Sequence, residues 1–317
     1  MPYSAENKQV VIIVGPTAIG KTSLSLELSQ RFSTEIVSAD SRQIYRYMNI
    51  GTAKPTQHEL HMAPHHFIDI KNPDEYYSAG MYGEEARLTI DDLLKKEKLP
   101  VVVGGSGFYI QALVDGFDDV AAYDSDIKLE LQQRVQTDGL GKLYAELQLI
   151  DRTTAERLHP NDTQRILRAL EVWQITGKPI SVFQVSQLNP CQFSPIYIGL
   201  MLNRQKLYKQ IEKRVDEMVA RGLVDEVKHL QELGYNESLQ SLRTVGYQEV
   251  FEFLHGQYPI HHMVGLIKQK TRNYAKRQIT WYKRDNRIRW FDTDDKYYVS
   301  DIIKYIESEL VRQDGNG

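Results

Sequence analysis

The chain has 317 residues, of which 41% are hydrophobic and 26% charged, a composition typical of a folded globular protein that excludes an intrinsically disordered one. At about 150 residues per domain, this length predicts roughly two domains. No run of about 18 apolar residues occurs, and the N-terminal residues lack the layout of a signal peptide, so we expect a cytoplasmic protein without a membrane span. The single cysteine, Cys191, excludes an internal disulfide framework.

Charge is unevenly distributed along the chain. The 39 basic and 42 acidic side chains give a net charge of −3, which by itself indicates no polyanionic partner. Between Lys268 and Trp290, however, nine basic residues accompany a single acid, Asp285. A solvated helix face usually carries charges of both signs, so this nearly single-sign stripe favours contact with a nucleic-acid backbone. Its basic residues are Lys268, Lys270, Arg272, Lys276, Arg277, Lys283, Arg284, Arg287 and Arg289.

The first third of the chain alternates strand and helix patterns. Val10–Val14 is a continuous β-branched run, which is typical of a strand buried on both faces. Strands that alternate with helices predict βαβ units and a parallel sheet. We expect strands at 10–14, 34–38, 67–70 and 101–103, with helices at 23–32 and 86–98.

Beyond residue 116 the pattern becomes mainly helical. Residues 126–187 read as helices separated by turns, whereas 196–202 and 288–292 read as two further strands. The other expected helices lie at 205–221, 224–233, 247–255 and 262–283, with a closing helix to about 312. The sequence therefore predicts an α/β core in two parts, 1–116 and 196–317, interrupted by a helical insertion at 117–195.

The most specific motif is Gly15–Thr22, which matches the G-x-x-x-x-G-K-[ST] phosphate loop throughout. It follows a predicted buried strand and precedes a predicted helix, so its backbone N–H groups and the helix N-terminus would face an anion. Lys21 would neutralise phosphate oxygens, and the Thr22 hydroxyl would bind Mg²⁺. The sequence thus predicts a P-loop NTPase-like parallel sheet core, flanked by helices and carrying an inserted all-helical domain, that binds a phosphorylated ligand.

Polar residues also follow other predicted strands. The strand at 101–103 ends in Gly104–Gly107 rather than in the carboxylate that a nucleotide hydrolase needs. Asp40 could be a metal-side carboxylate, a general base or an N-cap, and the residues alone leave these open. Ser106 either orients a substrate or caps a helix. His65 and His66 would point to opposite faces of a strand, so we expect a structural role rather than a shared metal.

Further segments carry a resemblance to a known family. In chain order they are Gly15–Thr22, Asp40–Tyr45, Gly51–Pro55, His65–Asp69, Gly104–Tyr109, His159–Asp162, Gln164–Arg165, Arg168–Glu171, Gly246–Tyr247 and Thr271–Trp281. With these segments the chain resembles the bacterial tRNA dimethylallyltransferases, also called tRNA isopentenyltransferases, between Val11 and Phe291. The joint order of the segments is what makes the resemblance specific.

The resemblance implies an enzyme that transfers a dimethylallyl group from dimethylallyl diphosphate to N6 of an adenosine beside the tRNA anticodon, releasing diphosphate. The phosphate loop and Mg²⁺ would hold the diphosphate leaving group, and Asp40 would be the general base. Ser106, where the family more usually has threonine, would contact donor and substrate. Arg214 matches an arginine expected to grip the diphosphate. The predicted cofactor is Mg²⁺, and any role for ATP stays open.

Two sets of binding residues follow from the matched segments. The residues implied for the donor diphosphate are Gly15, Pro16, Thr17, Ala18, Ile19, Gly20, Lys21, Thr22 and Arg214. Those implied for tRNA are Asp40, Ser41, Arg42, Gln43, Ser106, Lys128, Gln164, Arg165, Ile166, Leu167, Arg168, Thr271, Arg272, Lys276, Arg277 and Gln278.

The implied partners are the anticodon stem-loop of tRNA, gripped by the helical insertion, and dimethylallyl diphosphate. We expect a monomer with no membrane partner. Three other functions would also use the phosphate loop: a small-molecule kinase using ATP, an RNA-binding ATPase, and an enzyme that prenylates free adenine nucleotides. The basic stripe and the helical insertion favour tRNA prenylation over the kinase and the enzyme of free nucleotides. The missing carboxylate after Val103 counts against the ATPase.

Overall fold

The computed structural model describes residues 8–116, 123–183 and 190–314. The chain divides into two compact units, one made of Met1–Val114 with Cys191–Gly317 and the other of Asp115–Pro190. Residues 191–195, which the sequence placed in the helical insertion, therefore belong to the first unit. The reason is that strand β5 (Ser194–Met201) already begins within them.

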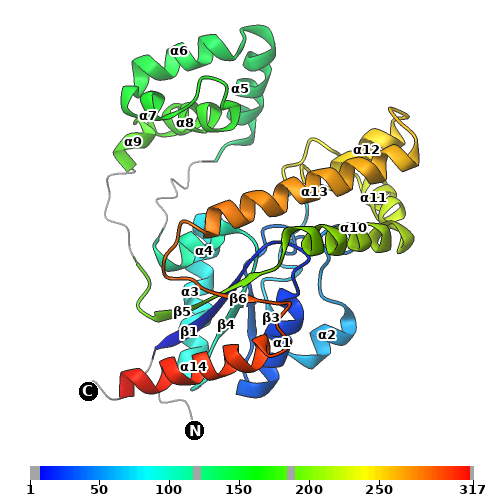
Figure 1. The fold of residues 1–317 in the computed structure, drawn as a ribbon. Helices are drawn as coiled ribbons and strands as arrows, with labels where there is room; N and C mark the ends of the chain where they lie inside the picture. The colour runs from blue at the N-terminus through cyan, green and yellow to red at the C-terminus, as the bar shows by residue number, and fades with distance from the viewer. Residues whose placement is uncertain (1–7, 117–122, 184–189, 315–317) are drawn as a thin grey trace. The chain divides into compact units, whose positions relative to one another are not determined.

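A six-stranded sheet, parallel throughout, forms the first unit (Figure 1). In spatial order its strands are β3 (His65–His66), β2 (Ile36–Ser38), β4 (Val101–Val103), β1 (Gln9–Val14), β5 and β6 (Arg289–Asp292). Val11 of the central strand pairs with Val101 on one side and with Ile196 on the other. Because all strands run the same way, the turns that follow them meet at one edge of the sheet.

β1 is buried along its whole length, and its alternate side chains enter two different cores. Val11 and Ile13 pack with residues of α1 (Lys21–Phe32) and α14 (Tyr298–Asp314). Val10 and Ile12 pack with residues of α3 (Ala79–Lys95) and α4 (Gly107–Val114). The sheet is thus covered by helices on both faces, as the continuous apolar run of β1 predicts.

The helices of the C-terminal half add a layer beside the sheet (Figure 1). They are α10 (Arg204–Ala220), α11 (Leu223–Glu232), α12 (Tyr247–Leu254) and α13 (Ile260–Tyr282), and α13 packs against both α10 and α12. One short helix, α2 (Gln57–Met62), lies between β2 and β3 in the chain; a capping box between Thr56 and Glu59 starts it.

The second unit is helical throughout its described residues. It consists of α5 (Ser125–Thr137), α6 (Leu140–Ile150), α7 (Arg152–Arg157), α8 (Thr163–Thr176) and α9 (Ile180–Phe183). Its own core includes Leu131, Leu143 and Ile166, all almost or fully buried. The Asp151 carboxylate ties its parts together, because it accepts hydrogen bonds from the backbone N–H groups of Thr154 and Ser181.

The predicted P-loop-type fold is confirmed, and most predicted elements lie within two or three residues of their observed bounds. The third strand was misplaced: it is His65–His66, whereas Phe67 and Asp69 adopt left-handed backbone angles, with φ of 64° and 55°. The helix expected from residue 86 begins at Ala79, because the Ser78 side chain caps it by accepting from Met81 N–H. The helix α2 was not predicted at all. No helix among the described residues has both the length and the apolar character needed to cross a bilayer.

Candidate active site

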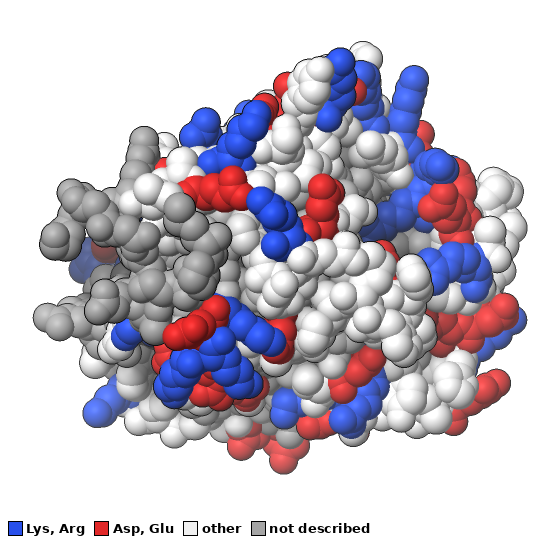
Figure 2. Space-filling model, turned by 90° about the horizontal axis from the view of Figure 1, so that it is seen from below, with Lys and Arg blue, Asp and Glu red and all other residues white. Residues whose placement is uncertain are grey.

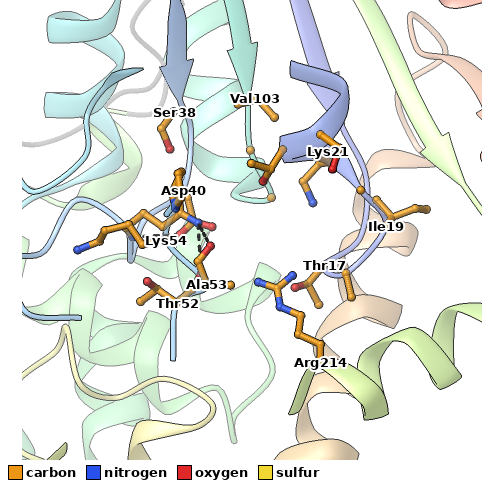
Figure 3. Close-up of a pocket in the computed structure, with 18 of the residues that line it drawn as sticks. Thr17, Ile19, Lys21, Ser38, Asp40, Thr52, Ala53, Lys54, Val103 and Arg214 are labelled. Carbon is orange, nitrogen blue, oxygen red and sulfur yellow. Dashed lines mark hydrogen bonds between the residues drawn. The ribbon is translucent and has the colours of Figure 1, made fainter. Parts of the chain in front are cut away.

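A cavity of about 500 Å³ lies in the first unit, at the edge where β1, β2 and β4 end. The phosphate loop, the turn after β2, the turn after β4, and helices α10 and α13 contribute to its walls. Figure 3 shows side chains from these elements converging on it. This is the position at which open parallel sheets bind their ligands.

The phosphate loop presents unpaired backbone donors to the cavity. Ala18 and Gly20 have positive φ, 65° and 96°, which turns the backbone before α1 begins at Lys21. None of the N–H groups from Ala18 to Thr22 donates a hydrogen bond to a described residue. Free donors at the start of a 12-residue helix make a favourable site for an anion.

Lys21 is held at the loop, where no acid among the described residues pairs with it. Its ammonium donates to the carbonyl oxygens of Gly15 (2.9 Å) and Pro16 (2.8 Å). Burial, and then the nearby charge of Arg214, lower the pKa of Lys21 to about 7, although Asp40 acts in the opposite direction. A bound anion would relieve this destabilisation of the charged form.

Arg214 points into the cavity from α10, opposite Lys21 (Figure 3). No described residue forms a hydrogen bond or an ion pair with it, and burial lowers the pKa of its guanidinium, with Asp40 and Glu217 opposing. Two half-buried cations that face each other without a paired anion indicate a site for a multiply charged anion such as a diphosphate.

Further residues of α10 line the cavity beside Arg214, and sequence reasoning did not identify them. They are Gln210, Glu217, Met218 and Arg221. Their spacing of three, four or seven residues from Arg214 puts them on the same helix face. Helical periodicity around Arg214 would therefore have identified them.

Asp40 follows β2 and lines the same cavity. One carboxylate oxygen accepts from the backbone N–H groups of Arg42 (2.9 Å) and Gln43 (3.3 Å), so it caps the turn at 41–44 rather than a helix. The other oxygen has no hydrogen bond with a described residue. Of the three roles open for Asp40, capping of a local turn is therefore present in the structure, and it leaves one oxygen available for chemistry.

The segment 49–55 forms another wall, and a glutamate of α11 holds it in place. The Glu226 carboxylate accepts from the backbone N–H groups of Asn49 (2.9 Å), Ile50 (2.7 Å) and Gly51 (3.1 Å) and from the Tyr247 hydroxyl (2.7 Å). A Cβ on Gly51 would lie 2.4 Å from the Tyr247 ring, so only glycine fits there. Nothing in the local sequence links Glu226 to this segment.

The segment then orients Gln43 and Lys54. The Gln43 amide nitrogen donates to the carbonyl oxygens of Thr52 (3.2 Å) and Ala53 (3.1 Å). Lys54 is 8% exposed, and its ammonium donates to the Tyr45 carbonyl oxygen, to Asn49 Oδ1 and to the Asp69 carboxylate. Lys54 therefore acts as an internal crosslink of the wall rather than as a free cation.

The residues predicted for the donor site and for the reacting end of the tRNA are only partly brought together in the cavity. Its lining contains Thr17 to Thr22, Asp40, Gln43, Arg214 and Gln278. Gly15, Pro16, Ser41, Arg42 and Ser106 are neighbours in the chain that do not line it. Ser106 lies beside the lining residue Gly105, and its backbone N–H donates to the Ala39 carbonyl oxygen (3.3 Å). His65 also lines the cavity, yet its Nδ1 lies 2.8 Å from the Ala63 carbonyl oxygen, while His66 pairs with Glu35.

The predicted tRNA residues lie on two structural units. Lys128 and the segment 164–168 belong to the helical unit, where Ile166 is fully buried in the core, so its side chain offers no contact surface. Arg165 is exposed and pairs with Asp162, and Arg168 pairs with Glu171. Thr271, Arg272, Lys276, Arg277 and Gln278 belong to α13.

The basic stripe is partly neutralised by acids of α10 and α12 and by its own acid, Asp285. Ion pairs join Lys268 to Asp216, Lys270 to Glu249, Arg272 to Glu212 and Arg287 to Asp285. Lys276, Arg277, Lys283 and Arg284 are exposed and form no ion pair with a described residue. The free positive charge therefore lies on the C-terminal turns of α13 and just beyond them.

The donor set in the cavity fits Mg²⁺ only together with a phosphorylated ligand. No group of three or more His, Cys, Asp or Glu side chains within the described residues could hold a metal ion by itself. Mg²⁺ commonly takes one or two protein oxygens and completes its shell with phosphate oxygens and water. The Thr22 hydroxyl and the free oxygen of Asp40 can supply those protein ligands, since both residues line the cavity.

Comparison with known proteins shows the family of the chain. Residues 43–285 match the family model described as IPP transferase. The chain is 44% identical over 312 residues to the tRNA dimethylallyltransferase of Caldanaerobacter subterraneus, covering 95% of this chain and 98% of that one. It is 46% identical over 284 residues to that of Thermotoga neapolitana, covering 90% and 92%. The chain belongs to the tRNA dimethylallyltransferase family. It is therefore an enzyme of the prenyltransferase class.

Solved structures of the family share the fold. The tRNA isopentenylpyrophosphate transferase of Bacillus halodurans superimposes with a TM-score of 0.72 at 36% identity, covering 98% of this chain and 99% of that chain. A eukaryotic dimethylallyltransferase, described as acting on tRNA, gives a TM-score of 0.81 at 26% identity, covering 97% of this chain and 80% of that chain.

We predict that diphosphate binding depends on the protonation of Lys21. In the free protein its pKa is lowered to about 7, and a bound diphosphate would raise it, so binding takes up a proton above pH 7. The affinity advantage of the wild type over Lys21→Met should be on the order of 100-fold at pH 6 and fall by up to about tenfold per pH unit above 7. Calorimetric titration with inorganic diphosphate measures the affinity of each protein. The ratio of the two affinities removes the effect of the ligand's own protonation. A ratio that is constant from pH 6 to 9 would contradict the assignment.

Proposed function

We propose that this enzyme transfers a dimethylallyl group from dimethylallyl diphosphate to N6 of an adenosine beside the tRNA anticodon and releases diphosphate. The observation that carries the proposal is one cavity in which an unpaired anion site meets a carboxylate with a free oxygen. The relatives at about 45% identity, named tRNA dimethylallyltransferases, support the substrate class.

The donor end of the cavity suits a diphosphate leaving group. As the allylic C–O bond breaks, its electron pair goes to the diphosphate oxygen, and negative charge grows there. The free N–H groups of Ala18–Thr22, the Lys21 ammonium and the Arg214 guanidinium stabilise that charge in a partly enclosed site. Mg²⁺ bound at the Thr22 hydroxyl would supply further positive charge to the same oxygens.

The acceptor end of the cavity needs a base, because the exocyclic amine of adenine is a weak nucleophile. As N6 bonds to the allylic carbon, one N6 proton has to leave. Asp40, Glu59 and Glu217 all line the cavity, and Asp40 is the one whose charge acts on Lys21 of the phosphate loop. Its capped oxygen fixes the orientation of the carboxylate, and its free oxygen accepts the proton. The acceptor oxygen of Gln43 has no described partner, so it can accept from the same amine. Ser41, Arg42 and Ser106 border this end of the cavity and would contact neighbouring nucleotides.

The tRNA surface centres on the free charge of α13. Lys276 and Arg277 lie near the C-terminus of α13, and Lys283 and Arg284 follow directly after its last residue, Tyr282. Figure 2 shows the face seen from below Figure 1. Over the described part of this face, acidic and basic side chains are interspersed. We assign Lys128, Gln164, Arg165 and Arg168 of the helical unit to binding of the anticodon stem. Ile166 and Leu167 would contact it only through their own backbone atoms.

Nucleoside mass spectrometry tests the reaction directly. Unmodified tRNA incubated with the protein, Mg²⁺ and dimethylallyl diphosphate should yield isopentenyladenosine in the digest. Free adenosine monophosphate serves as the control acceptor and should stay unmodified. No isopentenyladenosine from a competent tRNA, or phosphoryl transfer from ATP to a small acceptor, would overturn the proposal.

The variant Asp40→Asn separates the base from a metal ligand. Asparagine keeps the oxygen that caps the turn but cannot accept a proton, so the single-turnover transfer rate should fall by roughly 10²–10⁴-fold. Binding of diphosphate with Mg²⁺ should stay within about threefold, because the base acts only in the transfer step.

The variant Asp74→Asn, which changes an exposed residue, is the matched control and should leave the transfer rate unchanged. Full turnover by Asp40→Asn would remove Asp40 from catalysis. A loss of Mg²⁺-dependent diphosphate binding would instead make it a metal ligand.

Removing two free charges of α13 should weaken tRNA binding and its salt dependence. For Lys276→Gln with Arg277→Gln, the slope of log affinity against log salt concentration should decrease by roughly 1.4 to 1.8, since two phosphate contacts are lost. The pair Lys95→Gln with Lys96→Gln, at the end of α3, changes the net charge equally and should leave the slope unchanged. Filter binding of an anticodon stem-loop at several salt concentrations measures both, and equal slopes for the two variants would exclude α13 from the interface.

A further inference from the structure

Gln278 is the buried polar residue of the basic helix α13. Its side chain is 5% exposed, whereas its neighbours Lys276 and Arg277 are exposed. The carboxamide oxygen accepts from the Thr17 backbone N–H (2.9 Å), and the carboxamide nitrogen donates to the Gly105 carbonyl oxygen (2.9 Å). One side chain thereby joins the phosphate loop to the turn that follows β4.

Only a carboxamide of this length satisfies both partners. Glutamate could accept from Thr17 but, when ionised, has nothing to donate to Gly105, and methionine can do neither. The turn is also shaped to receive the amide, because a Cβ on Gly105 would lie 2.3 Å from the Gln278 nitrogen. Any other side chain therefore leaves the buried Gly105 carbonyl group, the partly buried Thr17 N–H group or both without a partner.

The turn held by Gln278 is packed directly on the backbone between the end of β2 at Ser38 and Asp40. A Cβ on Gly104 would lie 2.0 Å from the Ala39 carbonyl oxygen, so the two backbones are in close contact. The Ser106 N–H donates to that same oxygen, and the Ala39 N–H donates to the Val103 carbonyl oxygen (2.7 Å). Gln278 therefore stands between the loop assigned to the donor and the backbone that carries the carboxylate.

We infer that Gln278 is a positioning residue that sets the separation between the donor diphosphate and Asp40. The inference rests on the proposed function, because it concerns the distance between the two ends of that cavity. The donor site and Asp40 are both present without Gln278. Loss of the Gln278 side chain therefore changes the alignment of the reacting atoms. A misplacement of about 1 Å costs on the order of 100-fold in rate. RNA bound to the exposed residues of α13 would contact the same helix that carries Gln278.

The variant Gln278→Met tests the inference, with Gln269→Met as its matched control. Methionine preserves the volume and apolar contacts of the buried chain but removes both hydrogen bonds. The single-turnover transfer rate should fall by about 10- to 100-fold, while the dissociation constants of inorganic diphosphate and of the anticodon stem-loop stay within about threefold. Gln269 is exposed on the same helix and should tolerate the change without effect.

Hydrogen exchange provides a readout that does not depend on turnover. The amide of Thr17 should exchange faster in Gln278→Met and stay protected in Gln278→Glu, which retains the acceptor. The transfer rate should nevertheless fall in both variants, because both lose the donor to Gly105. If Gln278→Met unfolds the protein, Gln278→Glu still tests the link to Gly105.

Three results would overturn the inference: a wild-type transfer rate in Gln278→Met, unchanged protection of Thr17, or a defect confined to RNA affinity. The last would make Gln278 an RNA contact. A wild-type protein without transfer activity would defeat the proposed function instead, and the exchange measurement would still decide whether Gln278 links the two turns.

Discussion

Two cationic side chains, Lys21 and Arg214, share one cavity, and the surrounding structure has to hold them together against their mutual repulsion. Burial lowers the pKa of both side chains, and the charge of Arg214 lowers the pKa of Lys21 further. Asp40 is close enough to oppose these shifts, but it forms an ion pair with neither. Such an arrangement costs folding free energy and is favourable once a multiply charged anion enters, as is common for binding sites.

Buried polar side chains from the second half of the chain hold the backbone that surrounds these charges. Gln278 links the phosphate loop to the turn after β4, and Glu226 holds the segment at 49–51. Each of these links spans more than 170 residues of sequence. The cavity thus depends on the whole first unit, in which α10, α11 and α13 support the turns that follow the N-terminal strands.

Tertiary pairing also changes the meaning of the basic stripe. Acids on α10 and α12 neutralise Lys268, Lys270 and Arg272, so these three bases join α13 to its neighbouring helices and add little free positive charge. The free charges lie at the other end of the helix, on turns that also carry Gln278. One helix therefore combines internal packing, a link to the donor loop and an exposed basic surface.

The sequence alone determined the parts of this protein whose physics is local. The phosphate loop is eight consecutive residues, and the buried β-branched run before it predicts the parallel sheet, so both followed from the residues. The strand at His65–His66 was placed two residues too late. The turn at Phe67 and Asp69 depends on left-handed backbone angles, which neither residue type predicts. Resemblance placed Arg214, while its partners on the same helix face went unnoticed. Only the tertiary structure decided that Gln278 and Ile166 are buried, that Glu226 holds the cavity wall, and which bases of α13 stay free. Those outcomes depend on hydrogen bonds and ion pairs between segments far apart in the chain, and such pairings leave no local pattern.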